Sequence, residues 1–289
     1  MAENKKVIIS SDSTTDLSPE LIERYNVRIK PLEVVMGDKS YIDGVEATPD
    51  DLYEYAERTG TLAKTSATGI GEHMEFFQSL TADGSELVYL TISSAMSANN
   101  NNARLAAEEV PGVYVVDTKN LSTGGGLLVI AAAEMANAGL SACEIAEKVS
   151  ALADNVDASF VVDDLNYLAK GGRCSAVAAL GANLLKLKPC IVVKGGSMGV
   201  EKKYRGNFAS VLKTYIDERL ADADDIDTTR VFVTHAGVDA AVLDSCVEQV
   251  KAALPWGEVF ATRAGCTISA HCGRNTLGVL FVRKTPLIK

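Results

Sequence analysis

Short runs of aliphatic and β-branched residues alternate with amphipathic stretches along the first half of the chain. Two of the amphipathic stretches begin with a hydroxyl residue followed by proline, at 18–19 and 48–49, the pattern of a capped helix start. Strands that alternate with helices predict a mainly parallel sheet with helices on its faces. We predict strands at 7–10, 27–36, 86–93 and 113–119, and helices at 19–25, 49–58, 71–80, 101–109, 124–139 and 141–154.

The second half continues this alternation, and no Pro- or Ser-rich linker separates it from the first. We therefore predict two closely packed domains, 1–157 and 158–289. The small residues around His271 predict neither a helix nor a strand. Strands are predicted at 155–165, 190–194, 199–204, 230–237, 258–265 and 278–284, and helices at about 207–222 and 238–254.

Composition and charge disfavour several classes of function. The chain has 289 residues, 47% hydrophobic and 23% charged, as in ordinary folded soluble proteins. Its net charge of −10 disfavours nucleic acids and anionic membranes as partners. No apolar run approaches the ~20 residues of a membrane span, and the first residues lack the apolar core of a signal peptide. We expect a cytoplasmic protein without stable membrane insertion.

The six cysteines and three histidines do not form a metal-binding pattern, because no Cys-x-x-Cys pair occurs. We expect reduced, mostly buried thiols and neither a metal nor a cofactor. Cys266 and Cys272 flank His271, so a reactive thiol at one of these two positions stays an open alternative. The glycines at 124–126 lack the spacing of a dinucleotide-binding motif and are explained by close helix packing. No Walker-type lysine motif occurs, so we do not expect this chain to bind ATP itself.

Hydroxyl-rich loops lie between the predicted strands and helices of the first half. In open α/β sheets, ligands bind beyond the carboxyl ends of the strands, where helix N-termini attract anions. Each loop alone is explained by capping and turn formation. Together they are equally consistent with a polar, anion-accepting cleft. The loops span 11–18, 64–71, 93–102 and 118–126.

Two glycine-containing segments of the second half bear on catalysis and binding. G-x-S-x-G at 195–199 puts Ser197 where a hydrolase has its nucleophile, but both flanking runs predict strands, so we predict a hairpin loop. A Gly-Gly pair precedes Arg173, and the Ala/Leu-rich helix predicted at 176–187 is apolar on nearly every face. That helix should be buried or line an apolar slot. Arg205 is also beside a glycine.

Segments spread over essentially the whole chain resemble the DegV family. The resemblance implies a two-domain α/β fold, with an N-terminal three-layer α/β/α domain on a mainly parallel sheet and a C-terminal α/β domain on a mixed sheet. A ligand is expected between the domains. The matching segments are DSTTDLS (12–18), KTSATGIGE (64–72), ISSAMS (92–97), VVDTKNLSTGGG (115–126), LNYLAKGGR (165–173), LLKLKP (184–189), YRG (204–206) and ISAHCG (268–273).

The resemblance also implies a function and a set of site residues. Members of the family bind fatty acids, and in characterised bacteria they are the binding subunits of fatty acid kinase in phospholipid metabolism. The implied role is a carrier and not an enzyme. The site residues would be Thr65, Ser97 and His271 around the fatty-acid carboxylate, Ser66, Ser93 and Ser94 near the head group, and Arg173 and Arg205 on the kinase-facing side.

Three segments depart from the family pattern. The chain reads TSAT at 65–68 where the family commonly has Thr-Ser-Gln-Pro, and SANN at 97–100 where it commonly has Ser-Gly-Thr-Tyr. CGRNTLG follows His271 in place of a Gly-Pro-Gly-like turn. These residues form loop walls and turns, so the departures bear on chain-length preference and partner choice more than on carboxylate binding.

The chemistry of a fatty acid explains the residue types. Each buried methylene contributes roughly 0.8 kcal/mol, so a sixteen-carbon tail could contribute about 12 kcal/mol before ordering costs. A buried carboxylate needs donors, which two hydroxyls and an imidazole provide. Two alternatives stay open: a serine hydrolase using Ser97 or Ser197 with His271, and a carrier of another apolar carboxylate without a kinase.

Overall fold

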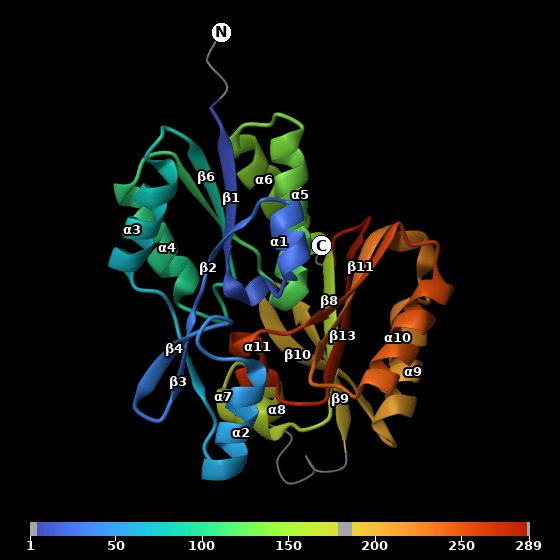
Figure 1. Ribbon diagram of the computed structural model, residues 1–289. Helices are drawn as coiled ribbons and strands as arrows, with labels where there is room; N and C mark the ends of the chain where they lie inside the picture. Colours follow the sequence, from blue (N-terminus) through green and yellow to red (C-terminus); the bar gives the residue numbers. More distant parts are fainter. Residues whose placement is uncertain (1–4, 179–186, 288–289) are drawn as a thin grey trace.

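The computed structural model describes residues 5–178 and 187–287 and contains three sheets (Figure 1). A four-stranded parallel sheet has the order β2-β1-β6-β7, a six-stranded mixed sheet has the order β10-β9-β8-β13-β11-β12, and a small antiparallel sheet has the order β4-β3-β5. The strands are β1 Val7–Asp12, β2 Arg28–Lys30, β3 Glu33–Met36, β4 Lys39–Ile42, β5 Lys64–Ser66, β6 Glu86–Thr91, β7 Val113–Asp117, β8 Val156–Val162, β9 Lys188–Lys194, β10 Ser197–Tyr204, β11 Ile226–Ala236, β12 Glu258–Arg263 and β13 Thr276–Arg283.

Helices cover both faces of the parallel sheet, which confirms the predicted three-layer arrangement. Phe77 and Ala103, from α3 and α4, pack with Tyr89 of β6 on one face. Ile145 of α6 packs with Leu90 of β6 on the other face. The helices are α1 Pro19–Arg24, α2 Pro49–Thr59, α3 Ile70–Thr81, α4 Asn99–Glu109, α5 Ser122–Asn137, α6 Ala142–Leu152, α7 Asn166–Gly171, α8 Ser175–Ala178, α9 Phe208–Arg219, α10 Ala240–Ala253 and α11 Cys266–Cys272.

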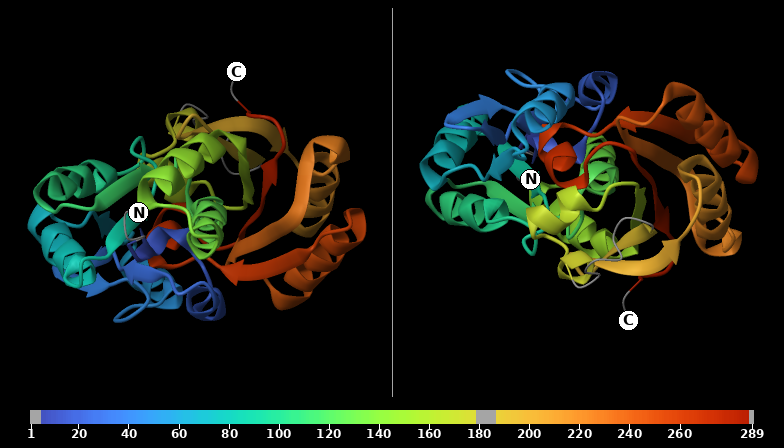
Figure 2. Two further views of the ribbon diagram at one scale, coloured as in Figure 1. Left: turned by 90° about the horizontal axis from the view of Figure 1, so that it is seen from above. Right: turned by 90° about the horizontal axis from the view of Figure 1, so that it is seen from below.

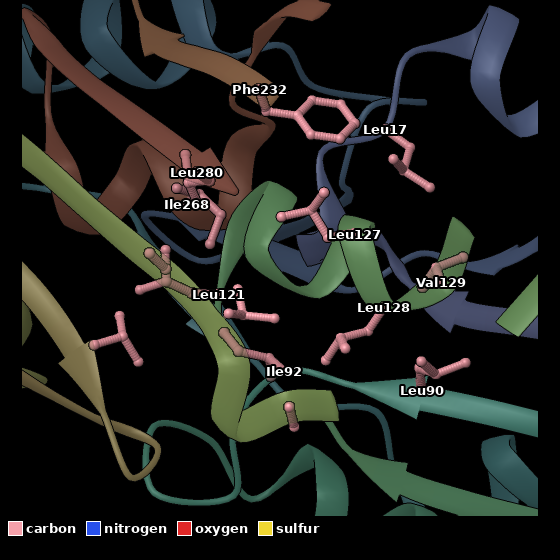
Figure 3. Packing of buried hydrophobic residues seen from close by; sticks show 14 of the residues in the cluster. Leu17, Leu90, Ile92, Leu121, Leu127, Leu128, Val129, Phe232, Ile268 and Leu280 are labelled. Atoms are coloured by element: carbon pink, nitrogen blue, oxygen red, sulfur yellow. The ribbon is translucent and has the colours of Figure 1, made fainter. Parts of the chain in front are cut away.

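Helix α5 lies between the parallel and the mixed sheets. Residues 127–130 are all buried, and they belong to one apolar cluster with Phe232 and Leu280 of the mixed sheet (Figure 3). A Cβ at Gly126 would lie 2.9 Å from the carbonyl oxygen of Thr15. The close packing expected for the glycines at 124–126 is therefore confirmed at this position.

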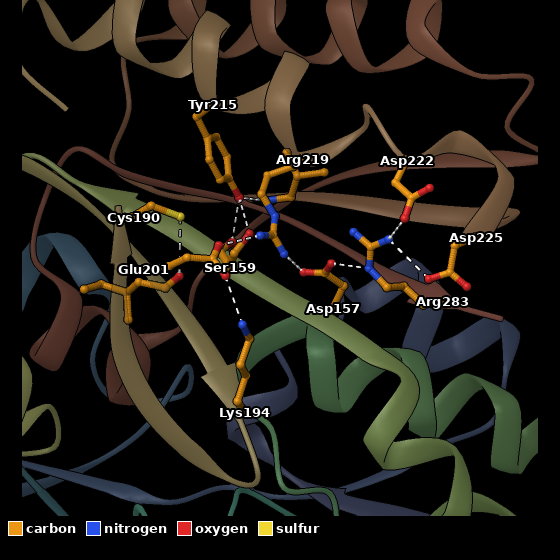
Figure 4. A network of polar contacts seen from close by, with 12 residues as sticks. Asp157, Ser159, Cys190, Lys194, Glu201, Tyr215, Arg219, Asp222, Asp225 and Arg283 are labelled. Carbon is orange, nitrogen blue, oxygen red and sulfur yellow. Dashed lines mark hydrogen bonds and ion pairs between the residues drawn. The ribbon is translucent and has the colours of Figure 1, made fainter. Parts of the chain in front are cut away.

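The other face of the mixed sheet is covered by α9 and α10, on the side of the molecule away from the parallel sheet (Figure 2). Asp157 of β8, whose side chain is 1% exposed, pairs with Arg219 of α9 and, at 2.7 Å, with Arg283 of β13 (Figure 4). Buried charges of this kind are stable only when paired. The network ties α9 to the sheet that it covers.

Three sequence predictions need correction. The run 27–36 is not one strand: Pro31, which cannot donate a backbone hydrogen bond, separates β2 of the parallel sheet from β3 of the small sheet. Residues 64–66, expected within a loop, form β5 by pairing with β3. His271 lies on helix α11, although the small residues around it gave no helix pattern.

The remaining predicted elements are present with ends shifted by a few residues. The hairpin at 195–199 is confirmed, since Ser197 of β10 pairs with Lys194 of β9. Of the helix predicted at 176–187, residues 179–186 lie outside the described part of the chain. The division near residue 157 stays a prediction: residue 157 lies within β8, and buried residues of both halves share one cluster.

Candidate functional site

A cavity of about 300 Å³ opens where the loops that follow β6 and β7 meet α7, β10 and α11. Most of its wall is apolar, with side chains from segments far apart in the sequence. The polar groups in the lining include Thr65, Ser66, Ser97, Arg173 and His271. The apolar wall includes Ile92, Met96, Leu121, Leu168, Met198 and Ile268.

The apolar wall continues toward the mixed sheet. Leu121, Ile268 and Cys272 also line a second cavity of about 30 Å³. Its further walls include Phe160 of β8 and Leu280 of β13. The two cavities together give an apolar lining that runs from the loops of the first half into the second half.

Two buried aspartates from the first half hold the start of α11. Asp43 accepts the backbone N–H of Cys266 at 2.8 Å and of Thr267 at 3.1 Å, and Asp16 accepts that of Gly265 at 2.8 Å. Side-chain oxygens at a helix N-terminus satisfy its free N–H groups, and a charged carboxylate there also interacts favourably with the helix dipole. This capping places α11 against β3, β5 and α7 (Figure 1). The sequence shows acidic residues in the first half, but no pattern in it predicts that two of them cap a helix that begins at residue 266.

His271 and Thr65 meet at the polar end of the cavity. The His271 Nε2 atom lies 2.9 Å from the Thr65 hydroxyl, whereas Nδ1 is buried without a hydrogen-bond partner among the described residues. Burial, and then the charge of Arg173, lowers the pKa of His271 to about 4, so the ring is neutral at pH 7. A Cβ at Gly171 would come within 2.6 Å of Nδ1, so only glycine leaves room for the ring.

Ser97 reaches the same cavity from the loop before α4. Its hydroxyl oxygen accepts the backbone N–H of Asn99 at 3.1 Å, which leaves its own hydrogen available to donate. Ser66 and Arg173 are exposed, and the Arg173 guanidinium donates to the Gly171 carbonyl at 2.8 Å. The structure thus brings together five of the eight residues named from the sequence.

The other three do not line this cavity. Ser93 is buried and donates to the Gly196 carbonyl at 2.7 Å, which joins its loop to the β9–β10 hairpin. Ser94 donates to the carboxylate of Asp117. Arg205 is exposed just after β10.

The hydrolase alternatives lack a serine–histidine contact in the described structure. Ser197 is exposed on the hairpin and is not part of the cavity lining. The ring of His271 bonds to Thr65, while Ser97 is bonded to Asn99. Activation of a serine requires a base within hydrogen-bond reach.

The two cysteines beside His271 are buried thiols. Burial raises the pKa of Cys266 and of Cys272 to about 12, so neither is a thiolate at neutral pH. The thiol of Cys266 donates to the Ala47 carbonyl at 3.1 Å. Both fit structural roles, since the thiolate is the reactive form.

Neither a metal site nor a membrane-spanning helix is found in residues 5–178 and 187–287. Within these residues, His, Cys, Asp and Glu side chains do not gather in groups of three that could hold a metal ion. No helix in the same ranges has both the length and the apolar character needed to cross a bilayer.

Residues 6–284 match the family described as "Uncharacterised protein, DegV family". The chain belongs to the DegV family. A DegV domain-containing protein of Staphylococcus aureus strain COL is 31% identical over 281 residues, which cover 96% of this chain and 99% of that protein. The family resemblance drawn from the sequence motifs is therefore confirmed.

Solved DegV structures share the fold. The solved structure of a DegV family protein from Thermus thermophilus is described as showing fatty acid binding. It has a TM-score of 0.89 and 28% identity, with 96% of this chain and 99% of that chain covered. DegV from Bacillus subtilis, described as a fatty acid binding protein, has a TM-score of 0.84 and 26% identity, with 97% of this chain and 100% of that chain covered. A stearic-acid-binding protein from Eubacterium ventriosum has a TM-score of 0.81 and 29% identity, with 96% of this chain and 98% of that chain covered.

Proposed function

We propose that this protein binds a long-chain fatty acid, with the carboxylate at Thr65, Ser97 and His271 and the tail along the apolar wall. The observation that carries the proposal is the composition of one cavity. Thr65, Ser97 and His271 come from distant segments and lie in one lining. Ser66, Arg173 and Thr267 are also part of that lining, and the remaining side chains are mostly aliphatic. The fatty-acid binding described for three solved relatives supports the same class of ligand.

The donors can be arranged without a formal positive charge on the ring. Neutral His271 donates from Nε2 to the Thr65 oxygen, so that the Thr65 hydrogen turns to the ligand. The Ser97 hydrogen is available because the Asn99 N–H occupies its oxygen. A buried carboxylate that accepts such bonds avoids the cost of an unpaired charge. Affinity then comes from the tail and orientation from the head group.

The second part of the proposal concerns phosphorylation. A separate kinase would transfer the γ-phosphoryl group of its bound ATP to the carboxylate oxygen and release ADP, so this chain acts as a carrier that presents the fatty acid. The exposed Arg173 at the cavity is suited to neutralise developing negative charge, and the exposed Arg205 to contact the kinase. We expect Arg205→Ala to retain lipid but slow acyl-phosphate formation. Unchanged turnover with the cognate kinase would remove that assignment.

Mass spectrometry of the purified protein under native and denaturing conditions tests the ligand. A tightly held fatty acid should add its mass to the native protein and separate on denaturation. A different apolar carboxylate in its place would support the carrier role and contradict the fatty-acid assignment. Stoichiometric labelling of Ser97 or Ser197 by a fluorophosphonate probe would favour the hydrolase instead.

A further inference from the structure

Four consecutive asparagines, residues 99–102, open helix α4. Asparagine is a weak helix former because its side chain competes for backbone hydrogen bonds. Three of the four side chains bond to groups outside α4. Asn100 donates to the Thr91 hydroxyl of β6 at 2.8 Å, whereas Asn101 is exposed. Asn99 and Asn102 both reach the loop that follows β5.

Asn99 is completely buried and connects three segments. Its side-chain N–H donates to Asp12 at 2.8 Å, its side-chain oxygen accepts the Thr68 backbone N–H at 3.2 Å, and its own backbone N–H donates to Ser97. Because the nitrogen must face the Asp12 carboxylate, the oxygen is fixed as an acceptor. His73 Nε2, 3.2 Å from that oxygen, must then carry the ring hydrogen.

Asn102 also contacts Thr68. Its side-chain N–H donates to the Thr68 carbonyl oxygen at 2.8 Å. Both backbone groups of Thr68 are therefore held by asparagine side chains of α4. Thr68 is three residues after Thr65, and Ser97 is two residues before Asn99. The asparagines thus connect the two loops that bring Thr65 and Ser97 to the cavity.

We propose that Asn99 and Asn102 form a clamp on Thr68 that positions the head-group loops and determines the preference for a carboxylate. This inference rests on the proposed fatty-acid function. The clamp fixes where Thr65 lies relative to Ser97, and the Asn99 backbone N–H occupies the Ser97 oxygen, which leaves the Ser97 hydrogen available to the ligand. Two donors at a fixed separation can serve the two oxygens of a carboxylate, whereas an alcohol has one oxygen to receive them.

The test compares two ligands of equal length in the delipidated full chain. Hexadecanoic acid and hexadecan-1-ol would each compete with a fluorescent fatty acid, and the ratio of their affinities is the readout. Asn99→Ala and Asn102→Ala should each lower the preference for the acid about tenfold, with affinity for the alcohol little changed. Asn101→Ala, at an exposed site, and Asn100→Ala, at a buried site bonded to β6, should keep the wild-type ratio.

The outcomes separate the clamp from the binding function. Asn102 is only partly buried, so Asn102→Ala tests the same prediction if Asn99→Ala fails to fold. An unchanged affinity ratio in Asn102→Ala would overturn the clamp. Because both asparagines act on Thr68, the double variant should lose less than the product of the single losses; a full product would also overturn it. Failure of the wild-type protein to bind the acid would instead overturn the proposed function.

Discussion

At the scale of single residues, the site depends on contacts between positions that are far apart in the chain. Thr65 and His271, which meet in the cavity, are separated by 206 positions. No spacing or periodicity links two such residues, so only the family resemblance could name them together. The hydroxyl content of the loops was equally consistent with capping and with a polar cleft, and the structure places the Thr65, Ser66 and Ser97 hydroxyl groups in the cavity lining.

His271→Ala should fold normally and lose fatty acid. The change removes the ring that bonds to Thr65 and leaves the wall otherwise intact. We expect at least about a tenfold loss of affinity, because without the ring the Thr65 hydrogen is no longer directed at the carboxylate, and one hydrogen bond to a charged group contributes about 1.5–3 kcal/mol. His271→Gln, which keeps an N–H donor, should lose less. Titration with delipidated protein checks both, and equal affinity in wild type and His271→Ala would contradict the assignment.

Asp16 predicts a dependence of stability on pH. Burial raises its pKa to about 8, so the folded protein holds a proton that the unfolded chain has released above about pH 4. The free energy of unfolding should therefore fall as pH rises from about 4 to 8 on account of this group. Asp16→Asn keeps an acceptor for Gly265 and, like the protonated acid, has a donor on the side of Ser122, and asparagine tolerates the positive φ of 48° at this position.

Urea unfolding at about pH 6 and about pH 8.5 measures this effect. The stability of wild type relative to Asp16→Asn should drop by on the order of 1–3 kcal/mol at the higher pH. A constant difference between the two proteins would show that Asp16 is ionised throughout this range.

At the scale of elements, periodicity predicted the long strands and helices and failed for some of the short ones. Strands β6, β8, β9 and β13 of the large sheets are mostly buried and rich in apolar residues, which the pattern detects. Helix α11 has only seven residues, and its start is held by Asp16 and Asp43 from the other half. β5 has three residues and exists through its pairing with β3. Tertiary contacts form both elements, and local sequence does not encode such contacts.

Two helical glycines should respond oppositely to alanine. Gly126→Ala puts a methyl group 2.9 Å from the Thr15 carbonyl and from Leu17, and we expect destabilisation by about 1–3 kcal/mol. Gly71, in α3, has no atom within 4 Å of the added Cβ. Gly71→Ala should stabilise the protein by up to about 1 kcal/mol through helix propensity. Chemical denaturation measures both, and a neutral Gly126→Ala would contradict the packing described for α5.

At the scale of the whole molecule, α5 joins the two halves into one packed body. Residues of the parallel sheet, α5 and the mixed sheet share a single apolar cluster. We therefore expect one cooperative calorimetric transition, with equal van't Hoff and calorimetric enthalpies. Two resolved transitions would show that the halves, predicted as separate domains, unfold independently. The absence of a linker signal in the sequence agrees with the shared core.

Fold and site differ in how far the sequence predicts them. Alternating strands and helices indicate the α/β class by themselves, whereas the mixed sheet and the cavity follow from the family resemblance and the structure. Ser93, Ser94 and Arg205 belong to motifs of the family, but they lie outside the cavity lining. A motif locates a loop, and the packing of that loop decides which of its side chains line the cavity.

A crystal structure of the protein with hexadecanoic acid decides whether a fatty-acid carboxylate binds at Thr65, Ser97 and His271, as proposed. We expect carboxylate oxygens within about 3 Å of the Thr65 and Ser97 hydroxyls, and the tail against Leu121 and Ile268. A carboxylate bound elsewhere, or a tail outside this cavity, would contradict the proposal.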